Sequence, residues 1–220
     1  MTIKLWHCHN TRSLRPLWAL EEMALNYELV NLPFPPRFHQ KEYKDINELG
    51  TVPYLVDGPA QLTESSAMLL YLAEKYDKKS LLVSKDHPEY GDFLNWLFHS
   101  DATLTFPLSI VLRYDQFETP ERLQPQVAED YRLWFHARLK RINHHLTTKQ
   151  FLCANRFTIA DIAITYALYL GELLGLTKDY QPQTLEYLRR MKLRPAFEKI
   201  KHIGQEQSKY EITEAKEGIS

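Results

Sequence analysis

The hydrophobic and polar residues of the first 76 positions alternate between two periods. Apolar residues two apart indicate strands, and apolar residues three or four apart indicate helices. The predicted elements are, in order, a strand at 3–7, a helix at 14–23, a strand at 26–32, a short helix at 40–44, strands at 52–56 and 61–63, and a helix at 66–76. Asp57 and Gly58 lie between the last two strands and are a hairpin signal, because both tolerate positive φ. We therefore expect the first two strands to be parallel and the last two antiparallel.

The rest of the chain has a helical pattern. Residues 77–88 are mostly charged and polar, which is typical of a linker, and helical spacing then continues to about residue 207. Apolar residues mark three helices: Phe93, Trp96, Leu97 and Leu104; Val127, Tyr131, Trp134, Phe135 and Leu139; Ile159, Ile162, Ala163, Tyr166 and Leu170. The last set has the spacing of a buried helix. We predict an α/β domain at 1–78, a linker at 79–88, an all-helical domain at 89–207 and a flexible tail at 208–220.

Composition and charge narrow the class of protein. The chain has 220 residues, of which 44% are hydrophobic and 25% charged, as in an ordinary globular protein. Lys and Arg number 27 against 28 Asp and Glu, and without basic blocks this balance argues against a nucleic-acid partner. No segment approaches the roughly 20 apolar residues of a membrane span, and the first residues hold no apolar signal core. We expect a cytoplasmic protein without a membrane partner.

Several chemistries are not expected from the motifs. The chain has only 7 glycines and contains neither G-x-G-x-x-G nor G-x-x-x-x-G-K-[ST], so nucleotide sites of these kinds are not predicted. Two cysteines, Cys8 and Cys153, are too few for a disulfide scaffold, which fits a reducing compartment. Cys8 is a rival candidate for a nucleophile, but it has no C-x-x-C partner, which disfavours dithiol redox chemistry. His7, Cys8 and His9 could be metal ligands, but no second cluster completes a four-coordinate site, so no metal is predicted.

Two predicted helix starts could bind a ligand. At Ser65 and Ser66, backbone amides and the helix dipole favour a carboxylate, and Glu64 beside them could receive an ammonium group. In the turn 9–15, a hydroxyl or amide could donate to a thiolate and lower its pKa. Helix capping explains both sets of residues as well, and taken alone it is the simpler interpretation.

Pro53 stands at the start of a predicted strand. A cis bond to Val52 would turn the Val52 amide and carbonyl outward, where they could pair with the backbone of a peptide ligand. A trans proline that only marks the strand start is the more frequent case.

Taken together, these segments resemble the cytosolic glutathione S-transferases. The strings GTVPYLVDG (50–58), LTESSA (62–67) and LYLAEKY (70–76) resemble the glutathione-binding half of that family. TRSLR (11–15) followed by LWALEE (17–22) is similar to the serine-type bacterial and fungal members. FTIADI (157–162) resembles a signature of the family's helical domain, and it also reads as a capping box of Thr158 and Asp161.

The resemblance extends over about residues 3–205 and implies a fold and a ligand. The fold is a thioredoxin-like N-terminal domain with a cis proline, followed by an all-helical C-terminal domain. The ligand is glutathione as co-substrate, and the implied protein is a homodimer acting in detoxification. The residues implied to bind glutathione are Gln40, Thr51, Val52, Pro53, Glu64, Ser65 and, across a dimer interface, Asp101. Thr11, Asn10 or Ser13 is implied to contact the thiolate.

Two positions depart from the family pattern. Thr11 stands where many serine-type members have Ser, which keeps the hydroxyl but restricts its rotamers. Thr51 stands where a lysine often precedes Val-Pro, so a contact to the glycyl carboxylate is missing, and Gln40 or Lys41 could supply it instead.

The function implied by the resemblance is conjugation of glutathione to hydrophobic electrophiles. The electrophile is expected between the domains, against the aromatic residues Phe34, Phe106, Tyr114 and Phe117. Two alternatives stay open: glutathione-dependent reduction of disulfides or peroxides, and a glutathione-binding stress or regulatory protein without turnover.

Overall fold

The computed structural model describes residues 2–208, and the contacts within the chain divide them into two units. The first unit holds residues 2–82 and 192–208, and the second holds residues 83–191. The predicted flexible tail, 208–220, lies outside the described residues except for Ser208. Leu81, Leu82 and Val83, which fall in the predicted linker, are buried.

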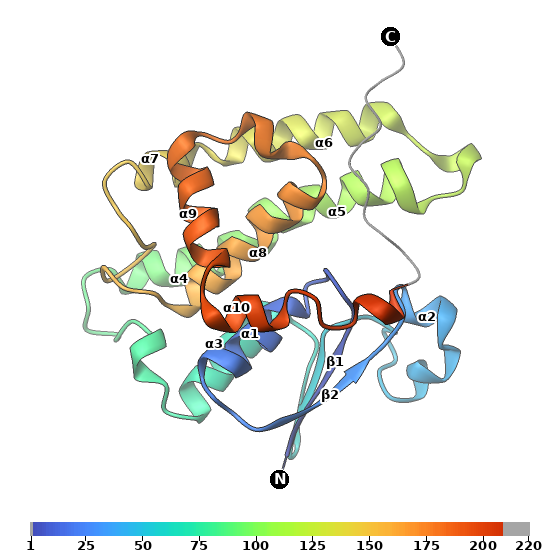
Figure 1. Ribbon diagram of the computed structural model, residues 1–220, viewed down its shortest axis with the longest axis horizontal. Coiled ribbons are helices and arrows are strands. Elements are labelled where there is room, and N and C mark those ends of the chain that lie inside the picture. Colours follow the sequence, from blue (N-terminus) through green and yellow to red (C-terminus); the bar gives the residue numbers. More distant parts are fainter. Residues whose placement is uncertain (1, 209–220) are drawn as a thin grey trace. The chain divides into compact units, whose positions relative to one another are not determined.

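A four-stranded sheet forms the centre of the first unit (Figure 1). Its strands are β1 (Ile3–His7), β2 (Tyr27–Asn31), β3 (Tyr54–Asp57) and β4 (Ala60–Leu62), in the order β2-β1-β3-β4. The pairing of β1 with β2 is parallel and that of β3 with β4 antiparallel, which confirms the prediction. Gly58 has a φ of 62° in the predicted hairpin turn. The thioredoxin-like arrangement expected from the sequence is therefore present.

The helices of the first unit follow the predicted order. They are α1 (Leu14–Glu22), α2 (Pro36–His39), α3 (Ser65–Lys75) and α10 (Pro195–Ile200), with 3-10 turns at Lys41–Asp45, Lys79–Leu81 and Gln205–Gln207. The short helix predicted at 40–44 is thus a 3-10 turn that follows a separate short helix. Every residue from 14 to 20 in α1 is buried, so this helix has no solvent-facing stripe over that stretch.

The C-terminal segment packs back onto α1. Phe197 of α10 contacts Trp18 edge-on, with ring centroids 4.9 Å apart. The Arg194 guanidinium forms a two-point ion pair with Glu22, at 2.6 and 2.8 Å. These contacts explain why residues 192–208 join the first unit, although their helical pattern is continuous with that of the second.

The second unit consists of helices. They are α4 (Tyr90–His99), α5 (Phe106–Leu112), α6 (Pro125–Arg138), α7 (Lys140–His145), α8 (Ile159–Leu173) and α9 (Pro182–Lys192), with 3-10 turns at Pro120–Arg122 and Leu176–Asp179. Two π-helical segments, Ser100–Thr105 and Arg113–Phe117, flank α5. Trp134, counted in the predicted apolar face of α6, is 49% exposed. Within residues 2–208, no helix combines the length and apolar character of a membrane span.

The core of the second unit is built on α8. Its N-terminus carries the predicted capping box, in which Thr158 and Asp161 cap each other's backbone amides. Asp161 is completely buried, and both carboxylate oxygens are used: Oδ2 accepts from the Thr158 amide and hydroxyl, and Oδ1 accepts from the Leu152 amide and the Tyr187 hydroxyl. One carboxylate thus joins α8, α9 and the loop before α8.

We expect Asp161→Asn to lower the free energy of unfolding by about 1–3 kcal/mol. Each carboxylate oxygen faces a backbone N–H, so either orientation of the asparagine amide sets an NH₂ group against a donor. Urea denaturation followed by circular dichroism measures the change. The control is Asp130→Asn on α6, where the exposed Asp130 side chain accepts from Gln126 and a change within about 0.5 kcal/mol is expected. Equal effects of the two substitutions would contradict this account.

Candidate functional site

The register of the sheet gathers several predicted site residues at one edge. β1 ends at His7, and its antiparallel partner β3 begins at Tyr54, which lies opposite Trp6. The turn that follows β1 and the residues that precede β3 therefore lie at the same end of the sheet. The bond between Val52 and Pro53 is cis, as the sequence resemblance implies.

The turn after β1 presents two polar residues to solvent and buries a third. Asn10 has a φ of 57° and Thr11 follows it, and both are half-buried. Ser13 is completely buried, and its Oγ lies 2.7 Å from Thr11 Oγ1 and accepts from the Cys8 amide at 3.2 Å. A ligand can therefore reach Asn10 and Thr11, whereas Ser13 can act on it only through Thr11.

Two buried side chains hold the backbone before Pro53 by hydrogen bonds. The Tyr43 hydroxyl and the Asn47 side-chain amide each donate to the Thr51 carbonyl at 2.9 Å, and both residues are buried. The Thr51 side chain is exposed, and Val52 is half-buried. Gln40 is half-buried at the end of α2. Tyr43 and Asn47 thus position a segment whose outer side remains open to a ligand.

The N-terminus of α3 carries an additional positive charge. Arg15 of α1 is 0% exposed, and its Nη1 donates to Ser65 Oγ at 2.9 Å. The guanidinium therefore adds its charge to the positive end of the α3 dipole, where an anion is favoured. Glu64, the N-cap residue, is exposed beside it. Sequence reasoning missed Arg15, although a charged residue inside the otherwise apolar stretch 14–20 was a visible signal.

Cys8 belongs to the apolar layer under this edge. It packs in a cluster with Trp6, Leu32, Tyr43 and Tyr54, and Phe34 is partly buried against the same cluster. Burial raises the pKa of the Cys8 thiol to about 12. The thiol is therefore protonated at neutral pH, and Cys8 is not suited to be the nucleophile.

The remaining predicted residues belong to the second unit. Asp101 lies half-buried in the first π-helical segment, and Phe106 is exposed at the start of α5. Tyr114 and Phe117 share the second π-helical segment, and both are half-buried. Phe34, the fourth residue of the predicted electrophile pocket, belongs to the first unit.

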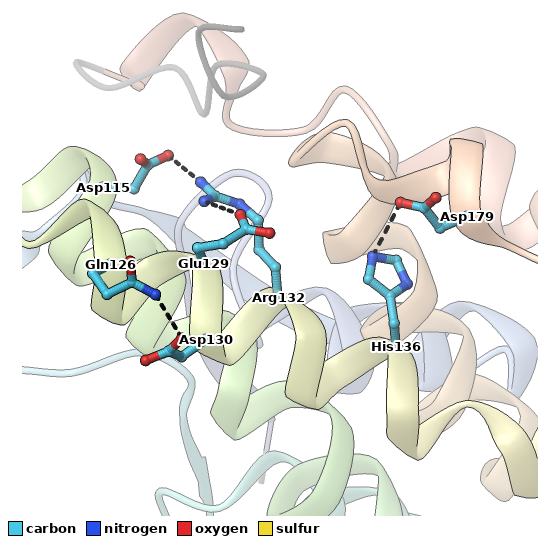
Figure 2. Close-up of polar contacts among 7 residues, drawn as sticks. All are labelled: Asp115, Gln126, Glu129, Asp130, Arg132, His136 and Asp179. Atoms are coloured by element: carbon cyan, nitrogen blue, oxygen red, sulfur yellow. Dashed lines mark hydrogen bonds and ion pairs between the residues drawn. The ribbon is translucent and has the colours of Figure 1, made fainter. Parts of the chain in front are cut away.

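Arg132 fixes the π-helical segment that carries Tyr114 and Phe117. Figure 2 shows its guanidinium between Asp115 of that segment, at 2.7 Å, and Glu129 of α6, at 3.3 Å. The Gln124 amide also donates to the Tyr114 carbonyl at 3.0 Å. These contacts thus hold the π-helical segment that carries Tyr114 and Phe117. Of the other contacts in Figure 2, that of Gln126 with Asp130 lies within α6, and that of His136 with Asp179 links α6 to the 3-10 turn before α9.

Comparison with known proteins identifies relatives along the chain. Residues 1–74 match the family model of the glutathione S-transferase N-terminal domain. Glutathione S-transferase 1 of Schizosaccharomyces pombe is 30% identical over 165 residues, which cover 72% of this chain and 71% of the relative. GstA of Escherichia coli O157:H7 is 26% identical over 88% of this chain and 94% of its own. The glutathione transferase URE2P6 of Phanerochaete chrysosporium, solved in complex with oxidized glutathione, superposes with a TM-score of 0.80 at 25% identity, covering 94% of this chain and 98% of that one.

Both cysteines should resist alkylation in the folded protein. Cys8 and Cys153 are buried, and burial raises the pKa of each thiol to about 12, so only roughly one thiol in ten thousand is ionised at pH 8. We expect iodoacetamide to modify both cysteines rapidly in urea but not in buffer, as measured by mass spectrometry. Rapid modification of Cys8 in the folded protein would show instead that its thiol is available for chemistry.

Proposed function

Because the chain belongs to the glutathione S-transferase family, we propose that it transfers the glutathione thiolate to hydrophobic electrophiles. The observation that carries the proposal is the edge of the sheet where a polar turn, a braced backbone segment and a positively charged helix start occur together. A thiol, a peptide backbone and a carboxylate are the groups that these three elements suit, and glutathione contains all of them.

The proposed binding mode assigns each part of the tripeptide to one element. The γ-glutamyl carboxylate binds the N-terminus of α3 at Ser65, where the buried guanidinium of Arg15 strengthens the attraction. Glu64 receives the γ-glutamyl ammonium, together with Asp101 of a partner subunit. The backbone of Val52, next to Pro53, pairs with that of the cysteinyl residue.

The proposed chemistry is a substitution at an electrophilic carbon. The glutathione sulfur forms a bond to the carbon, the bond to a leaving group such as chloride breaks, and the thiol proton has already passed to solvent. Asn10 and Thr11 surround the sulfur, and buried Ser13 acts through Thr11. Lowering the thiol pKa by about two units requires about 2–3 kcal/mol, which one or two hydrogen bonds to an anion can supply.

The electrophile is proposed to bind aromatic side chains: Phe34, Phe106, Tyr114 and Phe117. In this proposal the glutathione-binding domain is 1–78, a linker follows at 79–88, and the helical domain at 89–207 supplies the electrophile surface and the interface of a homodimer. Family membership supports a cytoplasmic protein with a role in detoxification.

Reduction of disulfides is the second candidate, and the complex of URE2P6 with oxidized glutathione favours it. One glutathione thiolate would attack a disulfide sulfur and release a thiol. A second glutathione would then attack the mixed disulfide, giving oxidized glutathione and the second thiol. The raised pKa of Cys8 supports a route in which glutathione, and not the protein, supplies both sulfurs.

The thiol pKa of bound glutathione is the decisive measurement. We expect the thiolate absorbance of the complex to titrate about two units below that of free glutathione. Substituting Asn10→Ala and Thr11→Ala together should return the pKa to the free value, because both reachable polar groups of the turn are lost. The same variants are assayed for turnover of 1-chloro-2,4-dinitrobenzene and of a small disulfide.

The controls separate the candidate functions. Asp130→Asn, exposed on α6, should leave pKa and turnover unchanged. Turnover of the disulfide alone would favour reduction. Binding of glutathione with an unshifted thiol pKa and no turnover of either substrate would favour a non-catalytic binding protein, and absence of binding would refute all three functions.

Thr51→Lys should strengthen glutathione binding. A lysine there would meet the glycyl carboxylate that Gln40 or Lys41 otherwise serves, and an exposed pair of this kind is worth about 0.2–1 kcal/mol. We expect the KM for glutathione to fall about two- to fivefold at low salt with kcat unchanged, and the gain to shrink at high salt. Thr51→Gln is the uncharged control. An equal gain in both variants would argue against an ionic contact.

A further inference from the structure

A chain of hydrogen bonds lies behind Thr11. Thr11 Oγ1 is 2.7 Å from Ser13 Oγ, and Ser13 Oγ is 2.8 Å from His7 Nδ1. At the far end, His7 Nε2 is 3.3 Å from the backbone carbonyl of Ile203. His7 and Ser13 are both completely buried, so water does not compete for these contacts. The chain thus runs from the half-buried turn to the C-terminal segment.

The Ile203 carbonyl is the last group in this series of hydrogen bonds, and it determines which atom donates at each step. A carbonyl oxygen can only accept, so the His7 hydrogen is on Nε2 and points at Ile203. Burial lowers the pKa of His7 to about 4, so the ring is neutral and Nδ1 accepts. Ser13 must then donate to His7, and the 2.7 Å contact between the two hydroxyls makes Thr11 the donor to Ser13. The Cys8 carbonyl, 2.9 Å from Thr11 Oγ1 and 3.2 Å from Ser13 Oγ, is a second acceptor on the same inner side of the turn.

The C-terminal segment is packed closely against the ring. Gly204 has a φ of 78°, and a Cβ atom built on it would lie 3.4 Å from His7 Cδ2 and 3.3 Å from Asn31 Oδ1. His9 Nδ1 also donates to the Ile203 carbonyl, at 3.1 Å. The carbonyl is therefore held in place by two imidazoles, of which only His7 contacts Ser13.

A role as the base that receives the thiol proton is excluded for His7 by magnitudes. The pKa of a cysteine thiol is about 8.5, so moving its proton to a group with a pKa of about 4 would cost on the order of 6 kcal/mol. Loss of the proton to solvent at pH 7 costs only about 2 kcal/mol. The geometry therefore allows His7 to act on the thiol site by orienting the hydroxyl groups of Ser13 and Thr11.

We propose that His7 is a positioning residue of the thiol site, which through Ser13 keeps the hydrogen of the Thr11 hydroxyl directed inward. The Ile203 carbonyl fixes the His7 tautomer that makes this arrangement possible, so the C-terminal segment acts on the turn. Thr11 then offers lone pairs, not a hydrogen, to the sulfur, and the donor to a sulfur anion must be another group of the turn. This inference rests on the proposed function only in naming glutathione as the source of the sulfur.

The test combines ligand-free protein with the glutathione complex. In the ligand-free protein, nitrogen-15 NMR should find the His7 hydrogen on Nε2, a result that does not depend on any ligand. In the complex, His7→Leu should lower the thiol pKa of glutathione by about one unit, a tenfold increase in the thiolate-to-thiol ratio, because the Thr11 hydrogen is no longer required by Ser13 and can turn to the anion, which is a stronger acceptor than the Cys8 carbonyl 2.9 Å from Thr11 Oγ1. In a Thr11→Val background, which keeps the β-branched shape, the same substitution should have no effect.

His9→Leu is the matched control, since it removes the other imidazole from the same carbonyl without touching Ser13, and it should leave the thiol pKa unchanged. If His7→Leu does not fold, Ser13→Ala breaks the same chain and should give the same shift. A His7 hydrogen on Nδ1, an upward or absent pKa shift, or a shift that persists with Thr11→Val would overturn the proposal. If the wild-type protein does not bind glutathione, the proposed function is refuted. The His7 tautomer would still decide the direction of the hydrogen bonds from Thr11 to Ile203.

Discussion

The pairing of β1 with strands on both of its edges is the constraint on which the site depends. Because β1 is central, its end at His7 meets the start of β3, and the chain must turn away there with its polar groups satisfied. Ser13 satisfies the Cys8 amide, and Tyr43 and Asn47 satisfy the Thr51 carbonyl. The buried backbone groups at this end of the sheet are thus hydrogen-bonded within the protein. The polar groups of the candidate site are those that stay exposed on the outer side.

Local sequence signals predicted the elements of the fold wherever a short segment sets its own structure. The Asp57-Gly58 hairpin and the Thr158–Asp161 capping box need only neighbouring residues, and both are present. The π-helical segments around α5 and the return of residues 192–208 to the first unit were not predicted. They depend on distant contacts, such as Arg132 with Asp115 and Phe197 with Trp18, which no periodicity encodes.

The residues of the candidate site also differ in whether the sequence alone predicts them. Motif resemblance led to Asn10, Thr11 and Val52, which are half-buried, and to Ser65, which is only 2% exposed. It did not lead to the buried residues behind them, because a histidine or arginine in an apolar stretch has the same local pattern whether it supports a site or only fills a core. The roles of Arg15 and His7 at the site follow from their hydrogen bonds to Ser65 and Ser13, which the sequence pattern does not predict.

The sulfur of Cys8 and the sulfur of a ligand thiol would have opposite surroundings at the turn after β1. The Cys8 thiol faces the apolar cluster beneath the sheet edge and donates to the Pro33 carbonyl, and burial raises its pKa to about 12. In the proposed function, a ligand thiol lies against Asn10 and Thr11, close to two helix N-termini whose positive ends favour an anion. Since a thiolate is the reactive form of a thiol, the proposed site would favour reaction at the sulfur of the ligand, whereas the Cys8 thiol stays protonated. In the proposed function the nucleophile therefore comes from the co-substrate, and its thiol pKa is tuned by Asn10 and by the residues that orient Thr11, and not by the cysteines of the protein.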